Sequence, residues 1–160
     1  MTTAIPYHVP VMGNEVVQWL VTDPSGLYAD FTAGGGGHTR LILNQIRDSG
    51  RIIGIDRDPE AIAETRRTLP EAVELWNIRF SDTLSKLSER FGSDFSGILM
   101  DLGVSSHQLD ESLRGFTFRS DGPLDLRMSQ TTGETAADLL ARFSEAELKQ
   151  ALKTLGEDPQ

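Results

Sequence analysis

The chain has 160 residues, of which 38% are hydrophobic and 24% charged, and it contains no cysteine. This length suffices for one domain with a substantial core, and the absence of cysteine excludes disulfides, thiolate zinc sites and cysteine nucleophiles. The formal net charge of −9 opposes binding to phosphate backbones, so any nucleic-acid partner must meet a local basic patch.

No apolar run reaches membrane-spanning length. The first six residues also lack the basic region and apolar block of a signal peptide. We therefore predict a cytoplasmic protein with no membrane partner, and no metal site is expected.

Ahead of the first predicted strand, residues 8–20 indicate an extended lead-in and then a short helix. Val16, Trp19 and Leu20 recur at helical spacing, so we expect them to share the buried face. The Pro-Ser-Gly sequence at residues 24–26 ends this segment.

A run of four glycines at residues 34–37 separates a predicted strand, residues 26–29, from the start of an amphipathic helix at residues 39–46. Glycine permits positive φ and leaves room for a ligand against bare backbone. Open α/β folds form a nucleotide crevice from a strand, a glycine turn and a helix. A flexible surface turn is the alternative, but the switch from strand to helix pattern favours a ligand site.

Three more strands are predicted after the glycine loop, at residues 51–56, 73–80 and 96–101. The first of them is apolar enough to be buried on both faces, which is typical of a parallel sheet. Helical patterns separate the strands, and the resulting βαβαβαβ order requires right-handed crossovers and a parallel sheet.

The helices between these strands have recognisable ends. The glycine-loop helix is expected to continue to about Gly50. Asp58 is the predicted N-cap of the next helix, with Pro59 at its first position. A third helix is predicted over residues 83–91, with Leu84 and Leu87 facing inward.

Asp56 ends the second predicted strand, 22 positions after Gly34. An acid at that place in nucleotide-binding α/β folds accepts hydrogen bonds from both ribose hydroxyls. A helix-capping role is the alternative, although Asp58 is better placed for it. Asp30, before the glycines, either lies near a cationic ligand or fixes the turn.

The glycines do not complete the dinucleotide fingerprint, because Thr39 occupies the position of its third glycine. The loop is not a phosphate-binding P-loop either, since the chain has no Gly-Lys-Ser/Thr. A nucleoside ligand without a pyrophosphate fits better, and S-adenosylmethionine is the common one. The missing third glycine and the block from Arg114 to Met128 also disfavour a nicotinamide-dependent dehydrogenase.

Three further side chains are candidates for the same crevice. Phe80 lies against an adenine ring or belongs to the core, and His38 orients part of the site or satisfies a backbone group. Asp101 follows the fourth predicted strand, where a carboxylate can orient the lone pair of an acceptor amine and take its proton late. Alternatively, Asp101 only holds its own loop.

Residues 102–128 form a long irregular stretch that holds Arg114, Arg119 and Arg127 together with Phe116 and Phe118. Arginines beside aromatic rings are suited to gripping unpaired RNA. A small core with solvated arginines is equally consistent with this pattern.

Two helices are predicted to follow the irregular stretch, at residues 135–142 and 145–155. The second is expected to begin behind a capping box formed by Ser144 and Glu147.

Together these motifs resemble the bacterial 16S ribosomal RNA cytosine-N4 methyltransferase family. The resemblance spans nearly the whole chain, and the blocks after residue 100 are its most specific part. The matching blocks are His8-Val9-Pro10-Val11 with Glu15, Asp30 to His38, Gly54 to Pro59, Asp101 to Asp110, Arg114 to Phe118, and Asp121 to Met128.

The resemblance implies a Rossmann-like class I methyltransferase sheet, α/β in class, followed by the start of an inserted α-helical domain. Residues 1–103 would be the first half of the cofactor-binding domain, and residues 104–160 the substrate loop and the first inserted helices. It implies that S-adenosyl-L-methionine is held by Gly36, Gly37, His38, Asp56, Phe80, Asp101 and Gln108.

The implied reaction is methyl transfer to the exocyclic N4 of a cytidine in 16S ribosomal RNA or the small ribosomal subunit. For this reaction the residues themselves lead us to predict Asp101 as the catalytic residue and Arg114, Arg119 and Arg127 as RNA contacts. Family chains complete the insertion and then finish the sheet, so this chain is expected to be truncated. The expected strand order of 3-2-1-4 leaves the fourth strand at an edge, which favours self-association or a completing chain. An inactive nucleoside-binding remnant is the alternative function.

Overall fold

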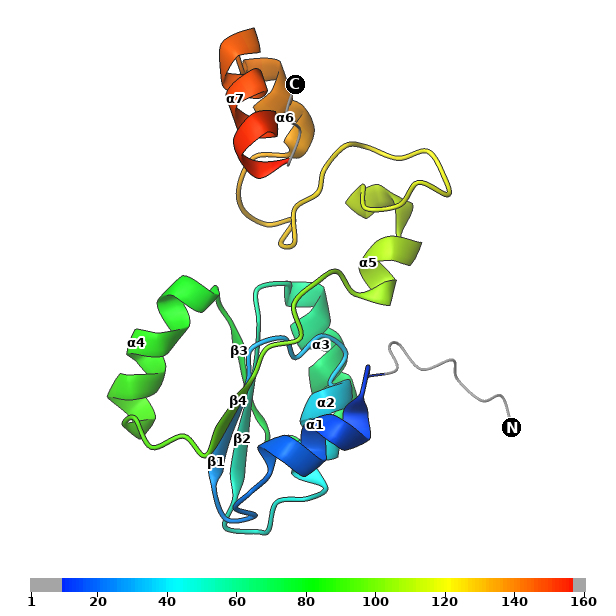
Figure 1. Cartoon of the computed structure of the whole chain (residues 1–160). Helices are drawn as coiled ribbons and strands as arrows, with labels where there is room; N and C mark the ends of the chain where they lie inside the picture. Colours follow the sequence, from blue (N-terminus) through cyan, green and yellow to red (C-terminus); the bar gives the residue numbers. More distant parts are fainter. Residues whose placement is uncertain (1–9, 157–160) are drawn as a thin grey trace, which may run out of the picture. The chain divides into compact units, whose positions relative to one another are not determined.

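The computed structural model describes residues 10–156, and the chain divides into two compact units, Met1–His107 and Gln108–Gln160 (Figure 1). His8 and Val9 of the lead-in motif lie outside the described residues. The sequence-based division fell after Gly103, and the functions assigned to its two parts remain predictions. Each unit is described below by itself.

A four-stranded parallel sheet is the centre of the first unit. Its strands are β1 (Leu27–Asp30), β2 (Arg51–Asp56), β3 (Glu74–Asn77) and β4 (Gly97–Leu99), in the order β3-β2-β1-β4. This confirms the predicted α/β class, the parallel sheet and the expected strand order. Because Asp30 pairs in register with Gly54 of β2 and Leu99 of β4, three strands end near one another at the carboxyl edge.

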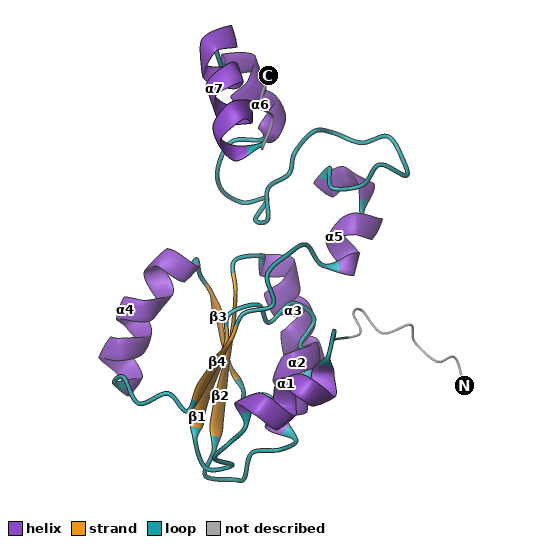
Figure 2. Ribbon diagram, in the orientation of Figure 1, coloured by secondary structure: helices purple, strands orange, loops and turns teal. Residues whose placement is uncertain are grey.

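Helices cover both faces of this sheet (Figure 2). One face lies under α1 (Gly13–Leu20), α2 (Gly37–Leu43) and α3 (Pro59–Thr68), and the other under α4 (Phe80–Phe91). Successive strand residues point to opposite faces. Their side chains therefore divide into two buried clusters, the first centred on Tyr28, Ile42, Ile52, Leu69 and Val73, the second on Ala29, Phe31, Ile53, Ile55 and Leu87.

The expected inward faces of two helices were partly wrong. Trp19 is 79% exposed, because α1 packs on the core through Val17 and Leu20 instead. Leu84 is 60% exposed, because α4 buries Thr83 and Leu87, which lie one full turn apart on a single face.

Helix lengths also differ from the sequence analysis. The glycine-loop helix ends at Leu43 and not near Gly50, because the chain turns there and the Arg47 N–H donates to the Pro24 carbonyl, 2.7 Å away. The helix predicted over residues 83–91 is α4, which begins at Phe80, three residues before the predicted start. By contrast, the predicted cap of α3 is confirmed, since the Asp58 side chain accepts from the Glu60 N–H.

The second unit is helical and irregular. The α5 helix (Ser106–Asp110) lies at the junction, and a 3-10 turn over Ser112–Arg114 follows it. The later helices are α6 (Ala136–Arg142) and α7 (Glu145–Leu155), and the predicted capping box of Ser144 and Glu147 is confirmed. Within residues 10–156, no helix is long and apolar enough to cross a membrane.

The position of β4 predicts self-association. Among the described residues β4 pairs with β1 alone, and the side chains of Ile98 and Met100 are partly exposed. An open apolar edge favours pairing with another chain. The average mass measured by light scattering should therefore rise with concentration, and Ile98→Lys should suppress the rise by placing a charge at this edge.

Leu155→Lys is the matched control, because Leu155 is an exposed apolar residue of α7 in the other unit. It should leave the association of the chain unchanged. A wild-type chain that stays monomeric at high concentration would contradict the prediction.

Candidate functional site

The candidate site lies at the carboxyl edge of the sheet in the first unit. Asp30 and Asp56 are the last residues of β1 and β2, and Asp101 lies two positions after the end of β4. Parallel α/β sheets bind ligands in the crevice outside this edge. The predicted site thus collects three carboxylates around the glycine loop.

The glycine loop needs its glycines for packing as well as for backbone conformation. Gly36 has φ +83°, and a Cβ there would lie 3.2 Å from the Thr65 methyl group of α3. A Cβ on Gly37 would lie 3.2 Å from the Pro10 ring. Both glycines therefore let the loop approach its neighbours closely, a role that the sequence analysis did not consider.

Asp56 fixes the glycine loop to β2. Its Oδ2 accepts the Gly34 N–H at 2.9 Å, and its Oδ1 accepts the Asp58 N–H at 2.9 Å. Burial raises the pKa of this carboxyl, whereas these two N–H groups lower it. A carboxylate has about four lone-pair sites, so each oxygen retains one acceptor position for a ligand hydroxyl.

Asp30 is fully buried and holds the turn after β1. Its Oδ1 accepts the Thr32 N–H at 3.0 Å, and its Oδ2 accepts the Thr39 hydroxyl at 2.7 Å. These contacts favour the turn-fixing interpretation of Asp30. Burial raises the pKa of its carboxyl, with the hydrogen bonds from Thr39 and Thr32 and the nearby His38 ring acting in the opposite direction.

Asp101 is anchored by its backbone and contacts His38 with its side chain. The Asp101 N–H donates to the Thr32 hydroxyl at 2.8 Å, and its Oδ2 lies 3.7 Å from His38 Nδ1. His38 is buried, while the Asp101 side chain is 34% exposed. The Asp101 backbone is therefore anchored, and its carboxylate remains partly exposed.

Phe80 presents a flat apolar surface next to β3. It is the first residue of α4 and is 37% exposed. Its ring lies 5.9 Å, between centroids, from the buried ring of Phe31. A side chain that packs on one buried ring and is itself partly exposed is suited to stacking on a ligand.

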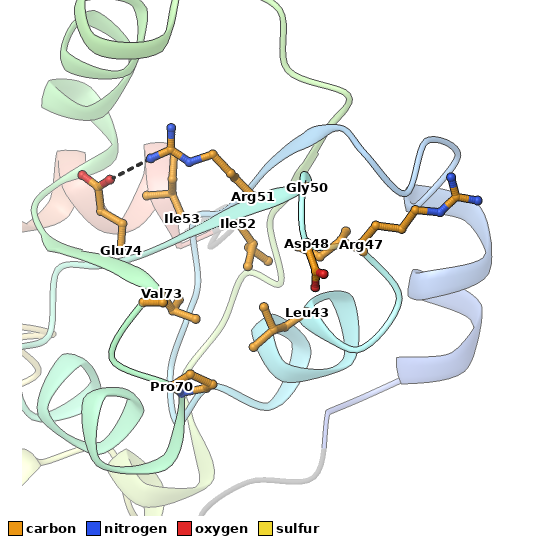
Figure 3. A pocket seen from close by; sticks show the side chains of 12 residues that line it. Leu43, Arg47, Asp48, Gly50, Arg51, Ile52, Ile53, Pro70, Val73 and Glu74 are labelled. Atoms are coloured by element: carbon orange, nitrogen blue, oxygen red, sulfur yellow. Dashed lines mark ion pairs between the residues drawn. The ribbon is translucent and has the colours of Figure 1, made fainter.

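A separate hollow of about 260 Å³ lies at the opposite end of the sheet, where β2 and β3 begin (Figure 3). Arg51 and Glu74 line it and form an ion pair with a nitrogen–oxygen distance of 3.6 Å. None of the predicted site residues lines this hollow.

In the second unit, two of the three predicted RNA-contacting arginines are engaged within the protein. Arg114 is 1% exposed, and its Nη2 donates to the Met128 carbonyl at 2.7 Å. Arg127 binds both oxygens of Asp125, at 2.8 and 2.7 Å, and this hydrogen bonding lowers the pKa of the Asp125 carboxyl. These contacts favour a structural role for both arginines.

Arg119 is different, because its side chain is 86% exposed and lies 3.7 Å from Asp110, itself exposed. The neighbouring Phe118 is also fully exposed. Gln108, predicted to bind the cofactor, is buried at the start of the second unit.

Comparison with known proteins assigns the chain to a family. The family model described as "MraW methylase family" matches residues 6–160. The chain belongs to this family. Curated relatives named ribosomal RNA small subunit methyltransferase H include those of Idiomarina loihiensis, 45% identical over 99% of this chain, and Nitrosomonas europaea, 46% identical over 94%.

The chain spans about half the length of these relatives, 51% of the Idiomarina protein and 48% of the Nitrosomonas protein. A crystal structure assigned as an rRNA-methylase, from Clostridium thermocellum, is 17% identical over 59% of this chain and 53% of its own, with a TM-score of 0.45. That likeness is too distant to support any inference.

Family membership makes a methyl donor the ligand to test against the site. Asp56 has acceptor positions left for ligand hydroxyls, and the Phe80 side chain is 37% exposed. The sequence analysis missed Thr32 and Thr39, which hold Asp30 and Asp101 in place. Their only sequence signal is their position on either side of the glycines.

The buried carboxylate of Asp30 predicts a specific pH dependence of stability. Its raised pKa means that, above the usual value for aspartate, the unfolded chain has lost a proton that the folded chain still holds. The free energy of unfolding therefore falls as pH rises through this window. Asn at this position cannot ionise, so Asp30→Asn lacks this fall. The difference between the free energies of unfolding of Asp30→Asn and the wild type, measured in urea, should therefore shift in favour of the variant as pH rises.

Thr39→Val provides a second measurement of the same effect. Removing the hydroxyl takes away the hydrogen bond that lowers the pKa of Asp30 most, so the fall in stability should extend to higher pH. A stability difference between wild type and Asp30→Asn that is constant across the acidic range would contradict this account.

Proposed function

We propose that this chain carries the cofactor-binding half of an S-adenosylmethionine-dependent methyltransferase that modifies the exocyclic N4 of a cytidine in 16S ribosomal RNA. The main support is that a chain of the MraW methylase family holds Asp56 and Asp101 on either side of β1 at the glycine-loop crevice. The names of its curated relatives support small-subunit ribosomal RNA as the substrate.

In this proposal the cofactor supplies a methyl group on a cationic sulfonium. Asp56 binds the ribose hydroxyls, Phe80 stacks on the adenine, and Gly36 and Gly37 let the loop approach the nucleoside. His38 and Gln108 complete the predicted binding set. The acidic edge of the sheet favours a cationic ligand.

Asp101 acts on the acceptor. The lone pair of a cytosine amine is delocalised into its ring, so the nitrogen must be oriented before it can form a bond to carbon. A carboxylate that accepts one N–H aligns the amine with the methyl group and raises the electron density on nitrogen. The exposed and anchored position of Asp101 suits this task.

We place the RNA contact of the second unit at Arg119 and Phe118. An exposed arginine can neutralise a phosphate, and an exposed ring can stack on an unpaired base. Ribosomal RNA or the small ribosomal subunit, in the cytoplasm, is the proposed partner. A second copy or a completing chain at β4 is proposed as well.

A nucleoside-binding module without catalysis is the second candidate, because the fixed glycine loop and Asp56 alone could hold a nucleoside. It would bind S-adenosylmethionine but transfer no methyl group. Binding measured by calorimetry, together with transfer of a labelled methyl group to small ribosomal subunits, distinguishes the two.

The role of Asp56 predicts a loss of cofactor affinity on substitution. Asp56→Ala removes two charge-assisted hydrogen bonds, each worth roughly 1.5–3 kcal/mol. Since about 1.4 kcal/mol corresponds to a factor of ten, the affinity for S-adenosylmethionine measured by calorimetry should fall at least tenfold.

Asp48→Ala is the matched control, because Asp48 is an exposed carboxylate at the opposite end of the sheet. It should bind like the wild type. Equal affinities for wild type and Asp56→Ala, or tighter binding of NAD than of S-adenosylmethionine, would refute the assignment.

The arginines predict different outcomes in RNA binding. Arg119→Ala should weaken binding of a small-subunit RNA fragment and reduce the slope of log affinity against log salt by about 1. Phe118→Ala should weaken binding by about 1–3 kcal/mol without changing the slope. Arg114→Ala should instead lower the thermal stability of the second unit.

Lys149→Ala serves as the control, since it removes one exposed positive charge from α7. It should change neither the affinity nor the salt slope. If it reduces the slope as much as Arg119→Ala does, the contact is general electrostatic attraction and the proposed RNA site is wrong.

A further inference from the structure

His38 is held so that one ring nitrogen is free to take a proton. Its Nε2 lies 2.9 Å from the carbonyl oxygen of Val11. A carbonyl only accepts hydrogen bonds, so Nε2 must carry the hydrogen. In the neutral ring, Nδ1 therefore has a bare lone pair.

That bare nitrogen faces a carboxylate. Nδ1 lies 3.7 Å from Asp101 Oδ2, and the imidazole ring is buried. Two lone pairs facing each other repel, whereas one proton between them converts the repulsion into an ion pair or a hydrogen bond. The neutral His38 ring and the Asp101 carboxylate can therefore share one additional proton between Nδ1 and Oδ2. Catalytic hydrogen bonds are often long before the substrate binds, so 3.7 Å is compatible with a contact that tightens.

Two acidic side chains lie close to the His38 ring. Asp101, beyond β4, and Asp30, at the end of β1, are the carboxylates close to His38. From the described part of the lead-in segment, the carbonyl of Val11 contacts the ring at Nε2. A proton that arrives at Nδ1 therefore lies between the imidazole ring and the Asp101 carboxylate, whose Oδ2 is 3.7 Å away.

We infer that His38 is the final acceptor of the proton that an acceptor amine loses, and that Asp101 passes the proton to it. This inference rests on the proposed function. Methyl transfer forms a nitrogen–carbon bond, and the electron pair of the broken sulfur–carbon bond stays with sulfur. The methylated nitrogen then releases one proton to Asp101 and keeps the electron pair of the broken N–H bond. Asp101 transfers this proton to His38 Nδ1.

This role explains the Val11 contact. The carbonyl orients the ring and fixes its tautomer, as second partners of functional histidines commonly do. In the opposite tautomer Nδ1 would already carry a hydrogen and could accept no proton from Asp101. A purely structural histidine that only anchors the lead-in would not require a particular partner at Nδ1.

The first test is nitrogen NMR of the full chain labelled with ¹⁵N-histidine, compared with Asp101→Asn. The wild type at neutral to basic pH should show His38 as the Nε2–H tautomer. On acidification Nδ1 should gain a hydrogen that is shifted downfield and protected from exchange, and this protection should be lost in Asp101→Asn. An Nδ1–H tautomer in the wild type, or an equally protected hydrogen in Asp101→Asn, would overturn the inference.

The second test uses His38→Gln, whose amide can still donate to Val11 but cannot be protonated. At saturating S-adenosylmethionine, methyl transfer to small ribosomal subunits should fall at least tenfold and lose its dependence on acidic pH. Unchanged transfer would overturn the inference. A wild-type chain that binds no S-adenosylmethionine would instead overturn the proposed function. The NMR test needs no cofactor, so it judges the His38–Asp101 pair separately from that outcome.

Discussion

The buried carboxylate of Asp30 is the constraint on which the candidate site depends. A charge with no exposed surface is costly unless hydrogen bonds satisfy it. Thr32 and Thr39 supply these bonds from the two sides of the glycine loop. Because the Thr32 hydroxyl also accepts the Asp101 N–H, satisfying one buried carboxylate ties the end of β1, the start of α2 and the segment after β4 together.

The glycine loop is held from the other side by hydroxyl groups of α3. The Thr65 hydroxyl lies 2.7 Å from the Gly34 carbonyl, and that of Thr68 lies 3.4 Å from the Gly35 carbonyl. Asp56 accepts a hydrogen bond from the Gly34 N–H, so both the N–H and the carbonyl of Gly34 are held by side chains outside the loop. A loop fixed in this way loses little further freedom when a ligand binds, which favours affinity.

Local patterns in the sequence predicted the features that local physics determines. The alternation of strands and helices, the Asp58 cap and the Ser144 capping box depend on residues a few positions apart. Features that depend on distant contacts were not predictable in this way. Arg114 is buried because carbonyls 13 and 14 residues away accept its hydrogens, and no spacing signals such a partner. Likewise, the four glycines indicated a ligand site, but the packing of Gly36 on α3 requires knowing that α3 lies beside the loop.

The two units separate the two halves of the proposed reaction. Gly36, Gly37, His38, Asp56, Phe80 and Asp101 all belong to the first unit, whose two buried clusters are formed by its own strands and helices. Arg119 and Phe118 belong to the second unit. The proposed cofactor contacts therefore come from the first unit and from Gln108 of the second. The proposed RNA contacts belong to the second unit, whose long irregular segment is held by the hydrogen bonds of Arg114 and Arg127. In the proposed reaction Asp101 acts on the acceptor amine, so the rate of transfer would depend on how the amine is brought to that carboxylate.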